Sequence, residues 1–237
     1  MTLHRSLIEL TGLCLVLWVG LLGSGGVGAQ VQSDNGSCGN VFVARYGPFD
    51  YRTATAAQRN VVEQYHFDAG VESLIKGMTG SVHGDINYTL NAFPNHPRAL
   101  IAMMNLRAKM KVELPTGAPF TFECYFIRAV TFRPDDAIAR IIYAKYLAAN
   151  GRKADAMQHL VVAADQAKDN AFTQYNIGLV YLELGAFDKA LIQAHRAMAL
   201  DFGRLELKQK LVAAGKWVDP PPPAAAEPAS AAASGPA

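Results

Sequence analysis

The sequence lacks the motifs that common enzymes and nucleic-acid-binding proteins share. Its Lys and Arg residues are scattered, its formal net charge is only +2, and no basic run alternates with aromatic residues, so nucleic acid is not an expected partner. The metal-ligand spacings HxxxH, HExxH and CxxC are absent, as are the serine motif GxSxG and the phosphate loop GxxxxGK(S/T). We therefore expect no catalytic residue, no metal ligand and no cofactor of these kinds, and a protein that is not an enzyme.

A long hydrophobic run is missing too. The longest apolar stretch, residues 10–22, has about 13 residues, whereas a membrane-spanning helix needs roughly 20. His4 and Arg5 precede this stretch and small residues up to Ala29 follow it, which is the pattern of a secretory signal peptide. We expect residues 1–29 to be cleaved, which leaves no stable membrane span and places the mature protein in the periplasm of a Gram-negative cell.

Cysteine is scarce: the chain has 3, and only Cys38 and Cys124 follow the expected signal peptide. In an oxidising compartment two such residues usually pair, and closing so long a loop would stabilise the fold by about 4 kcal/mol. The segment around Cys38 would then cross the outer side of the helix that carries Cys124. The alternative is a pair of free, unreactive thiols.

The remaining chain contains one pattern of small residues twice, 34 residues apart. A period of this length is typical of stacked helix-turn-helix units, in which each unit leaves an apolar face that only a neighbour can cover. Gly at a helix end allows a left-handed turn into the next helix, and Ala on the second helix allows it to approach the first closely. The repeated residues are Ala144, Gly151, Ala156 and Ala163 in the first copy and Gly178, Gly185, Ala190 and Ala197 in the second.

Residues 175–201, YNIGLVYLELGAFDKALIQAHRAMALD, resemble the tetratricopeptide repeat. The resemblance assigns Tyr181 to the family's aromatic position on the first helix, and the small residues of this copy to the family's small positions. Gln174 stands where the family usually has Trp, and Phe202 stands where it usually has Pro. The second departure predicts that the chain continues into a last helix, residues 205–214, which caps the stack.

The expected fold is all-α, a short right-handed helix-turn-helix solenoid of the tetratricopeptide type. An irregular N-terminal segment with one helix precedes the repeats and a capping helix ends them. The Pro- and Ala-rich tail that follows has too few large apolar residues to fold. The expected boundaries are 30–84 for the N-terminal region, 85–214 for the repeats (units 97–133, 137–170 and 171–204) with the capping helix, and 215–237 for the disordered tail.

The resemblance implies a protein that binds other proteins. In this family ligands commonly lie in a concave groove lined by the first helix of each unit, and the matching positions here form a mainly apolar surface. A partner helix or an extended peptide fits such a surface. We therefore expect an exported scaffold or assembly factor, for which an envelope complex is one setting. The groove positions are Ile138, Ile141, Lys145, Phe172, Tyr175, Asn176 and Leu179.

A second hypothesis places a site in the region before the repeats. Six side chains there have the chemistry of a metal or acid–base centre, which would make the chain a metal-binding or hydrolytic protein. The histidines are far apart in the sequence, so only the fold could bring them together. The alternative is that each side chain satisfies backbone groups or caps a helix. The six residues are His66, Asp68, Glu72, His83, Asp85 and His96.

Overall fold

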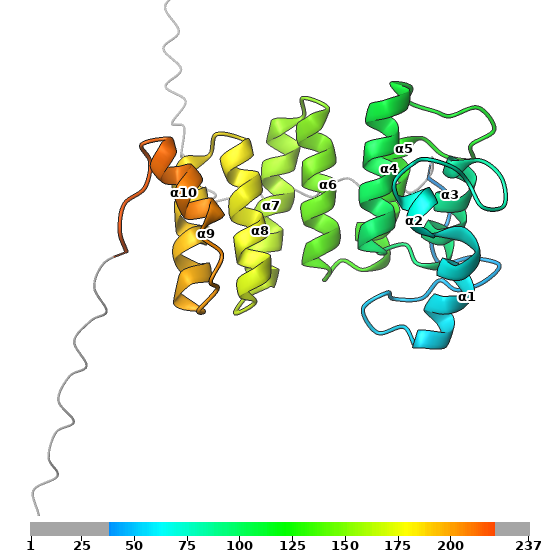
Figure 1. Cartoon of the computed structure of the whole chain (residues 1–237), viewed down its shortest axis with the longest axis horizontal. Helices are drawn as coiled ribbons and strands as arrows, with labels where there is room; N and C mark the ends of the chain where they lie inside the picture. The colour runs from blue at the N-terminus through cyan, green and yellow to red at the C-terminus, as the bar shows by residue number, and fades with distance from the viewer. Residues whose placement is uncertain (1–37, 221–237) are drawn as a thin grey trace, which may run out of the picture. The chain divides into compact units, whose positions relative to one another are not determined.

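The computed structural model of the protein describes residues 38–220, and this part of the chain forms ten α-helices and no β-strand (Figure 1). The expected signal peptide and the tail beyond residue 220 lie outside the described residues. Within the described part, no helix is both long enough and apolar enough to cross a membrane. The helices are α1 (Ala56–His66), α2 (Ala69–Glu72), α3 (Val82–Ala92), α4 (Pro97–Met110), α5 (Phe122–Phe132), α6 (Ala137–Ala149), α7 (Lys153–Ala167), α8 (Ala171–Glu183), α9 (Phe187–Ala199) and α10 (Glu206–Ala213).

Helices that follow one another along the chain pack against each other (Figure 1). The most extensive contacts join α6 to α7 and α8 to α9, and smaller ones join α3 to α4, α4 to α5, α5 to α6 and α7 to α8. Helices two apart also touch, α4 with α6 and α6 with α8, and α10 packs on α8 and α9. One apolar core therefore continues from Phe67 to Leu211.

The hairpins α6–α7 and α8–α9 turn in the same way. Gly151 and Gly185 have φ angles of +78° and +76°, a left-handed conformation that side chains disfavour. Ala156 and Ala190, on the second helices, are completely buried, so each of these helices approaches its neighbours closely. The small residues that repeat in the sequence thus lie at turns and at helix contacts.

The helices α4, α6 and α8 each begin with a side chain that accepts a hydrogen bond from the first turn. His96 caps α4, Asp136 caps α6 and Asn170 caps α8. The interval between the first two caps is longer than that between the last two, because residues 111–121 form an extended loop between α4 and α5. The pair α4–α5 therefore has a longer connection than the pairs α6–α7 and α8–α9.

Two helices, rather than the expected one, precede α3. The first, α1, begins after Thr55, whose hydroxyl accepts from the backbone N–H of Gln58 while the Gln58 side chain accepts from the backbone N–H of Thr55. The short α2 follows because Asp68 accepts a hydrogen bond from the N–H of Val71 and so starts a single turn. A helix of this length has too few residues to show a hydrophobic period in the sequence.

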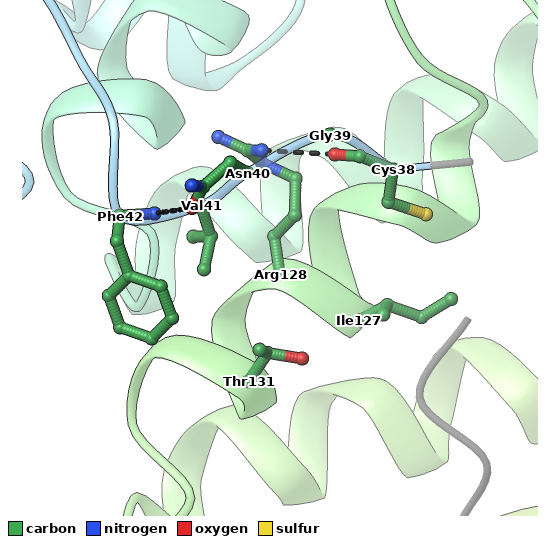
Figure 2. Close-up of a pocket in the computed structure, with 8 residues that line it drawn as sticks. All are labelled: Cys38, Gly39, Asn40, Val41, Phe42, Ile127, Arg128 and Thr131. Carbon is green, nitrogen blue, oxygen red and sulfur yellow. Dashed lines mark hydrogen bonds between the residues drawn. The ribbon is translucent and has the colours of Figure 1, made fainter. Parts of the chain in front are cut away.

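A disulfide joins Cys38 to Cys124, as expected, across a sequence separation of 86. Both residues are buried, with 2% and 3% of their surface exposed. Residues 38–42 lie along α5, where Arg128 donates a hydrogen bond from Nη1 to the carbonyl oxygen of Cys38 at 3.0 Å (Figure 2). The pair of free thiols is therefore excluded, and the disulfide fastens the N-terminal segment to α5.

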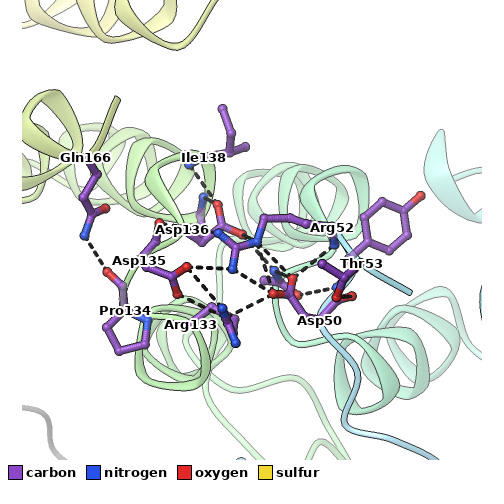
Figure 3. A network of polar contacts seen from close by, with 12 residues as sticks. Asp50, Arg52, Thr53, Arg133, Pro134, Asp135, Asp136, Ile138 and Gln166 are labelled. Atoms are coloured by element: carbon purple, nitrogen blue, oxygen red, sulfur yellow. Dashed lines mark hydrogen bonds and ion pairs between the residues drawn. The ribbon is translucent and has the colours of Figure 1, made fainter. Parts of the chain in front are cut away.

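A buried polar network fastens the same segment at two helix corners (Figure 3). Asn95 donates from Nδ2 to Asp50 Oδ1 at 2.7 Å and to Asp136 Oδ2 at 2.8 Å. Arg52 and Arg133 pair with Asp50 at 2.7 and 3.1 Å. Burial alone would raise the pKa of Asp50, but hydrogen bonds from Arg52 and Asn95 lower this pKa to about 2. The loop before α1, the corner before α4 and the corner before α6 are thus held together.

Candidate functional site

A cavity of about 450 Å³ lies where the C-terminal ends of α4, α6 and α8 come together, beside the start of α7. We call it the α4–α6–α8 groove. These three helices are the first helices of successive pairs and lie side by side (Figure 1). The polar residues that line the groove are Asn105 and Arg107 from α4, Lys145 from α6, Asn150, Lys153 from α7, and Glu183 from α8.

Positive charge predominates in the α4–α6–α8 groove. Its lining includes Lys145, Lys153 and Arg107, the last of which pairs with Glu113 outside the lining, and one acid, Glu183. The ammonium of Lys145 is 3.5 Å from Glu183 Oε1, and both side chains are about half exposed. Such an exposed ion pair is weak because water screens it. An anionic group of a partner could therefore replace Glu183 at little cost.

The groove has an aromatic floor. Tyr146 is buried and stacks on Phe126, with ring centroids 4.4 Å apart. Burial, with a smaller contribution from nearby acids, raises the pKa of Tyr146 to about 12, so the phenol stays neutral. Asn150 donates from its side chain to the carbonyl oxygen of Tyr146 at 2.7 Å and fixes the end of α6. The floor is therefore held by a ring contact and by a hydrogen bond at the end of α6.

Of the seven expected groove positions, Lys145 lines the cavity. Ile141 and Tyr175 are buried, with 5% and 3% of their surface exposed. The hydroxyl of Tyr175 donates to Glu206 Oε2 at 3.1 Å, and its ring packs on Phe202 with centroids 5.0 Å apart. Tyr175 is thus covered by the segment that leads into α10, which makes it a core residue.

The other four expected positions lie outside the cavity lining. Phe172 is 53% exposed and touches Phe202, with ring centroids 6.2 Å apart. The amide of Asn176 donates to the carbonyl oxygen of Phe172 in its own helix at 2.7 Å. Ile138 and Leu179 are partly buried against the main core. The open part of the groove therefore lies one to two turns further along the first helices than expected.

Sequence reasoning missed the residues at the C-terminal ends of the first helices. Ala149 and Glu183 both line the groove and are separated by the repeat period of 34 residues. The period could have pointed to this pair, since equivalent positions of stacked units face the same side. Arg107 precedes the enlarged loop and so falls outside the regular period.

Among the six residues of the second hypothesis, the structure brings His66 and Asp85 into direct contact. His66 Nδ1 is 3.0 Å from Asp85 Oδ1, and the His66 ring stacks on Tyr88 with centroids 3.8 Å apart. Asp85 is buried and also accepts hydrogen bonds from the hydroxyl of Thr79 and from the backbone N–H of Met78. Burial alone would raise the pKa of Asp85, but these hydrogen bonds lower it.

The remaining four residues have separate structural partners. His96 caps α4 and stacks on Tyr51, with centroids 4.0 Å apart, and burial lowers its pKa to about 4. His83 lies 3.2 Å from the hydroxyl of Tyr125. Asp68 caps α2 and Glu72 pairs with Arg98. Within residues 38–220, no group of three or more His, Cys, Asp or Glu residues is placed to hold a metal ion.

Ser73 and Lys76 have the SxxK spacing of some serine hydrolases. That motif requires both side chains on one helix, where residues three apart face each other. Here α2 ends at Glu72, and the hydroxyl of Ser73 donates to the carbonyl oxygen of Ala69. The spacing therefore does not produce a serine–lysine pair.

No family model matches this chain, and no curated protein matches it. Any assignment of function therefore depends on the geometry described above.

Proposed function

We propose that the chain is an exported, non-catalytic scaffold or assembly factor of the tetratricopeptide type, which holds a protein or peptide partner in the α4–α6–α8 groove. The observation that carries this proposal is the groove, a cavity of about 450 Å³ with three cations, one acid and a buried aromatic floor. Cavities of this size at the meeting point of several helices are common binding sites.

The arrangement of the helices supports the family part of the proposal. The units 97–133, 137–170 and 171–204 correspond to the pairs α4–α5, α6–α7 and α8–α9, and α10 has the place of the capping helix. First helices touch first helices across successive pairs, α4 with α6 and α6 with α8. A right-handed stack of tetratricopeptide units requires these contacts.

The lining of the groove indicates the chemistry of the partner. Lys145, Lys153 and Arg107 favour a segment with at least one carboxylate, whereas Tyr146 and Met104 favour an apolar side chain beside it. A mixed acidic and apolar segment of a helix or extended peptide has both. This partner is more acidic than one suited to the mainly apolar surface expected from the sequence.

The Cys38–Cys124 disulfide supports an oxidising compartment as the place of action. Together with the expected signal peptide, it favours the periplasm, where the protein would act as a part of an envelope complex. Labelling of the protein by an impermeant amine reagent, in cells whose outer membrane alone is permeabilised, tests this location. Labelling only after lysis of the inner membrane would contradict it.

A charge reversal in the groove tests the binding proposal. Peptides selected from a displayed random library on the wild-type protein are labelled, and their Kd values are measured by fluorescence anisotropy. We expect Lys145→Glu to raise the Kd of acidic peptides by roughly tenfold or more, because the substitution replaces attraction by repulsion inside the groove. Lys189→Glu on α9, an exposed residue outside the groove lining, makes the same charge change and serves as the control.

Equal Kd values for Lys145→Glu and the wild type would place binding elsewhere. Peptides selected without any acidic residue would also contradict the proposed chemistry. Tyr175→Ala is unsuitable for this purpose, because it removes a buried ring that packs on Phe202.

A hydrolytic function is the second candidate, and the contact between His66 and Asp85 is the observation that favours it. An acid that orients a histidine is one part of many acid–base sites. Hydrolysis of p-nitrophenyl acetate and p-nitrophenyl phosphate by the wild type and by His66→Ala tests this candidate. Turnover that the variant loses would support it, whereas equal rates in the two proteins would end it. Zinc bound by the wild type and lost in His66→Ala would support a metal site.

A further inference from the structure

A second cavity, of about 470 Å³, lies between the N-terminal segment and α5 (Figure 2). Residues 38–42 form one wall, and Ile127, Arg128 and Thr131 on the outer face of α5 form the other. Among the residues that the structure describes, this lining includes the apolar Val41, Phe42 and Ile127, one positively charged residue, Arg128, and no acid. The cavity is separate from the α4–α6–α8 groove, and neither the repeat pattern nor the proposed function accounts for it.

Arg128 is an unusual residue to find in this wall. It is 4% exposed, and its guanidinium donates to two neutral oxygens, the Cys38 carbonyl at 3.0 Å and Asn91 Oδ1 at 2.9 Å. One face of the guanidinium lies over the ring of Phe120, 4.8 Å from its centroid. Within residues 38–220, no carboxylate pairs with Arg128. Burial of this cation lowers its pKa, and an unpaired buried charge is costly.

We propose that this cavity binds a small monocarboxylate with an apolar body, whose carboxylate pairs with Arg128. A guanidinium has five N–H donors, and the two hydrogen bonds described above leave donors for an anion. A carboxylate can accept two parallel hydrogen bonds from the planar guanidinium. The apolar walls suit a short hydrocarbon body, and the volume falls in the range of small-molecule sites, roughly 300–1,000 Å³. The described lining residues carry a single positive charge and no acid, which favours one negative charge on the ligand.

Hexanoate is the probe for this proposal, and hexanamide is its uncharged counterpart of nearly the same shape. Each is titrated into the full-length mature protein, and binding is followed by calorimetry and by NMR shifts of α5 amides. We expect hexanoate to bind roughly 10- to 100-fold more tightly than hexanamide, because only hexanoate forms charge-assisted hydrogen bonds with Arg128. Equal affinities for the two probes, or no binding of hexanoate, would overturn the proposal.

Two variants test the site without removing Arg128, whose loss could unfold the protein. Asn91→Asp gives the guanidinium an internal carboxylate at a position that already contacts it at 2.9 Å. This variant should therefore bind hexanoate about tenfold more weakly than the wild type does, whereas its affinity for hexanamide should be unchanged. Ile127→Phe fills the cavity and should lower the affinity for both probes. Hexanoate binding that survives both changes would place the ligand elsewhere.

The other occupant to be tested is the part of the chain that precedes Cys38. Asp34 precedes the described residues and is the acid nearest to Cys38 in the sequence. If the wild type fails to bind hexanoate and Asp34→Asn binds it, the cavity serves the chain itself and the small-ligand proposal is overturned. Equal binding of hexanoate by the wild type and by Asp34→Asn supports it.

Discussion

Replacing Asn95 by Asp should strongly destabilise the protein, although it exchanges only one nitrogen for an oxygen. Asn95 is 2% exposed and lies between two carboxylates, with Nδ2 donating to Asp50 at 2.7 Å and to Asp136 at 2.8 Å. Its Oδ1 accepts from the backbone N–H of Tyr51 at 2.9 Å. The Asp side chain keeps this acceptor and the shape of the residue, but it loses both donors.

The expected cost follows from those two hydrogen bonds. A hydrogen bond to a charged group contributes about 1.5–3 kcal/mol, so the loss of both amounts to about 3–6 kcal/mol at pH 7. Arg52 and Arg133 lie beside Asp50 and offset part of the repulsion among the three carboxylates, so we base the magnitude on the hydrogen bonds alone. A change of this size is a large share of the stability of an ordinary domain, about 5–15 kcal/mol.

The destabilisation should depend on pH in a known direction. The new carboxylate at position 95 faces two others, so its pKa in the folded state is raised above the unfolded value, and the native variant binds more protons. The variant therefore regains stability as the pH falls from 7 towards 5. Asp50 in the wild type has its pKa lowered from the ordinary 3.8 to about 2, so the stability that it contributes is fully present above pH 3.8 and is lost only below that pH. The contribution of this network to the stability of the wild type should thus change little between pH 7 and 5.

Urea unfolding followed by far-UV circular dichroism at pH 7 and pH 5 measures both effects. Asn176→Asp on α8 is the matched control, because its amide bonds only to the Phe172 carbonyl of its own helix. We expect the control to lose less than about 1 kcal/mol. If Asn95→Asp is within 1 kcal/mol of the wild type at pH 7, or if the gap grows on acidification, the reasoning about this network is wrong.

Three further changes test other parts of the structure. In Gly178→Ala the new Cβ would lie 2.4 Å from Cδ2 of the buried Leu207, so we expect a loss of about 1–3 kcal/mol from overpacking and faster hydrogen exchange in α10. The same change should cost less when it is made in a Leu207→Ala background, and an equal cost in both backgrounds would contradict the clash. Reduction of the Cys38–Cys124 disulfide should lower the free energy of unfolding by about 4 kcal/mol, measured in urea with and without reductant; a loss below 1 kcal/mol would contradict the loop-closure argument. Burial lowers the pKa of His159 to about 4 from its ordinary 6.5, so on acidification the unfolded chain takes up this proton first and stability falls by about 3 kcal/mol between pH 7 and 4. His159→Phe should flatten that pH dependence, and an unchanged slope would count against it.

Much of the helical part could be predicted from the sequence because its determinants are local. Gly151 and Gly185 end helices through their own backbone conformation. Thr55 and Asp136 begin helices through hydrogen bonds to their own first turns. The expected last helix, residues 205–214, corresponds to α10 with a shift of one residue at each end. These features depend on a few neighbouring residues, so a single sequence contains the information needed.

The sequence predicted neither the lining of the α4–α6–α8 groove nor the cavity beside Arg128, and the reason is the same for both. Each depends on contacts between residues far apart in the chain: Lys145 with Glu183 across two helix pairs, and Arg128 with the carbonyl oxygen of Cys38 across a sequence separation of 90. A repeat period states which positions are equivalent, but it does not state which of them a terminal segment covers. Tyr175 illustrates this, since Phe202 packs on its ring and converts a groove position into a core position. Which helix faces stay exposed in this protein therefore depends on the segments at its two ends as well as on the pattern of small residues.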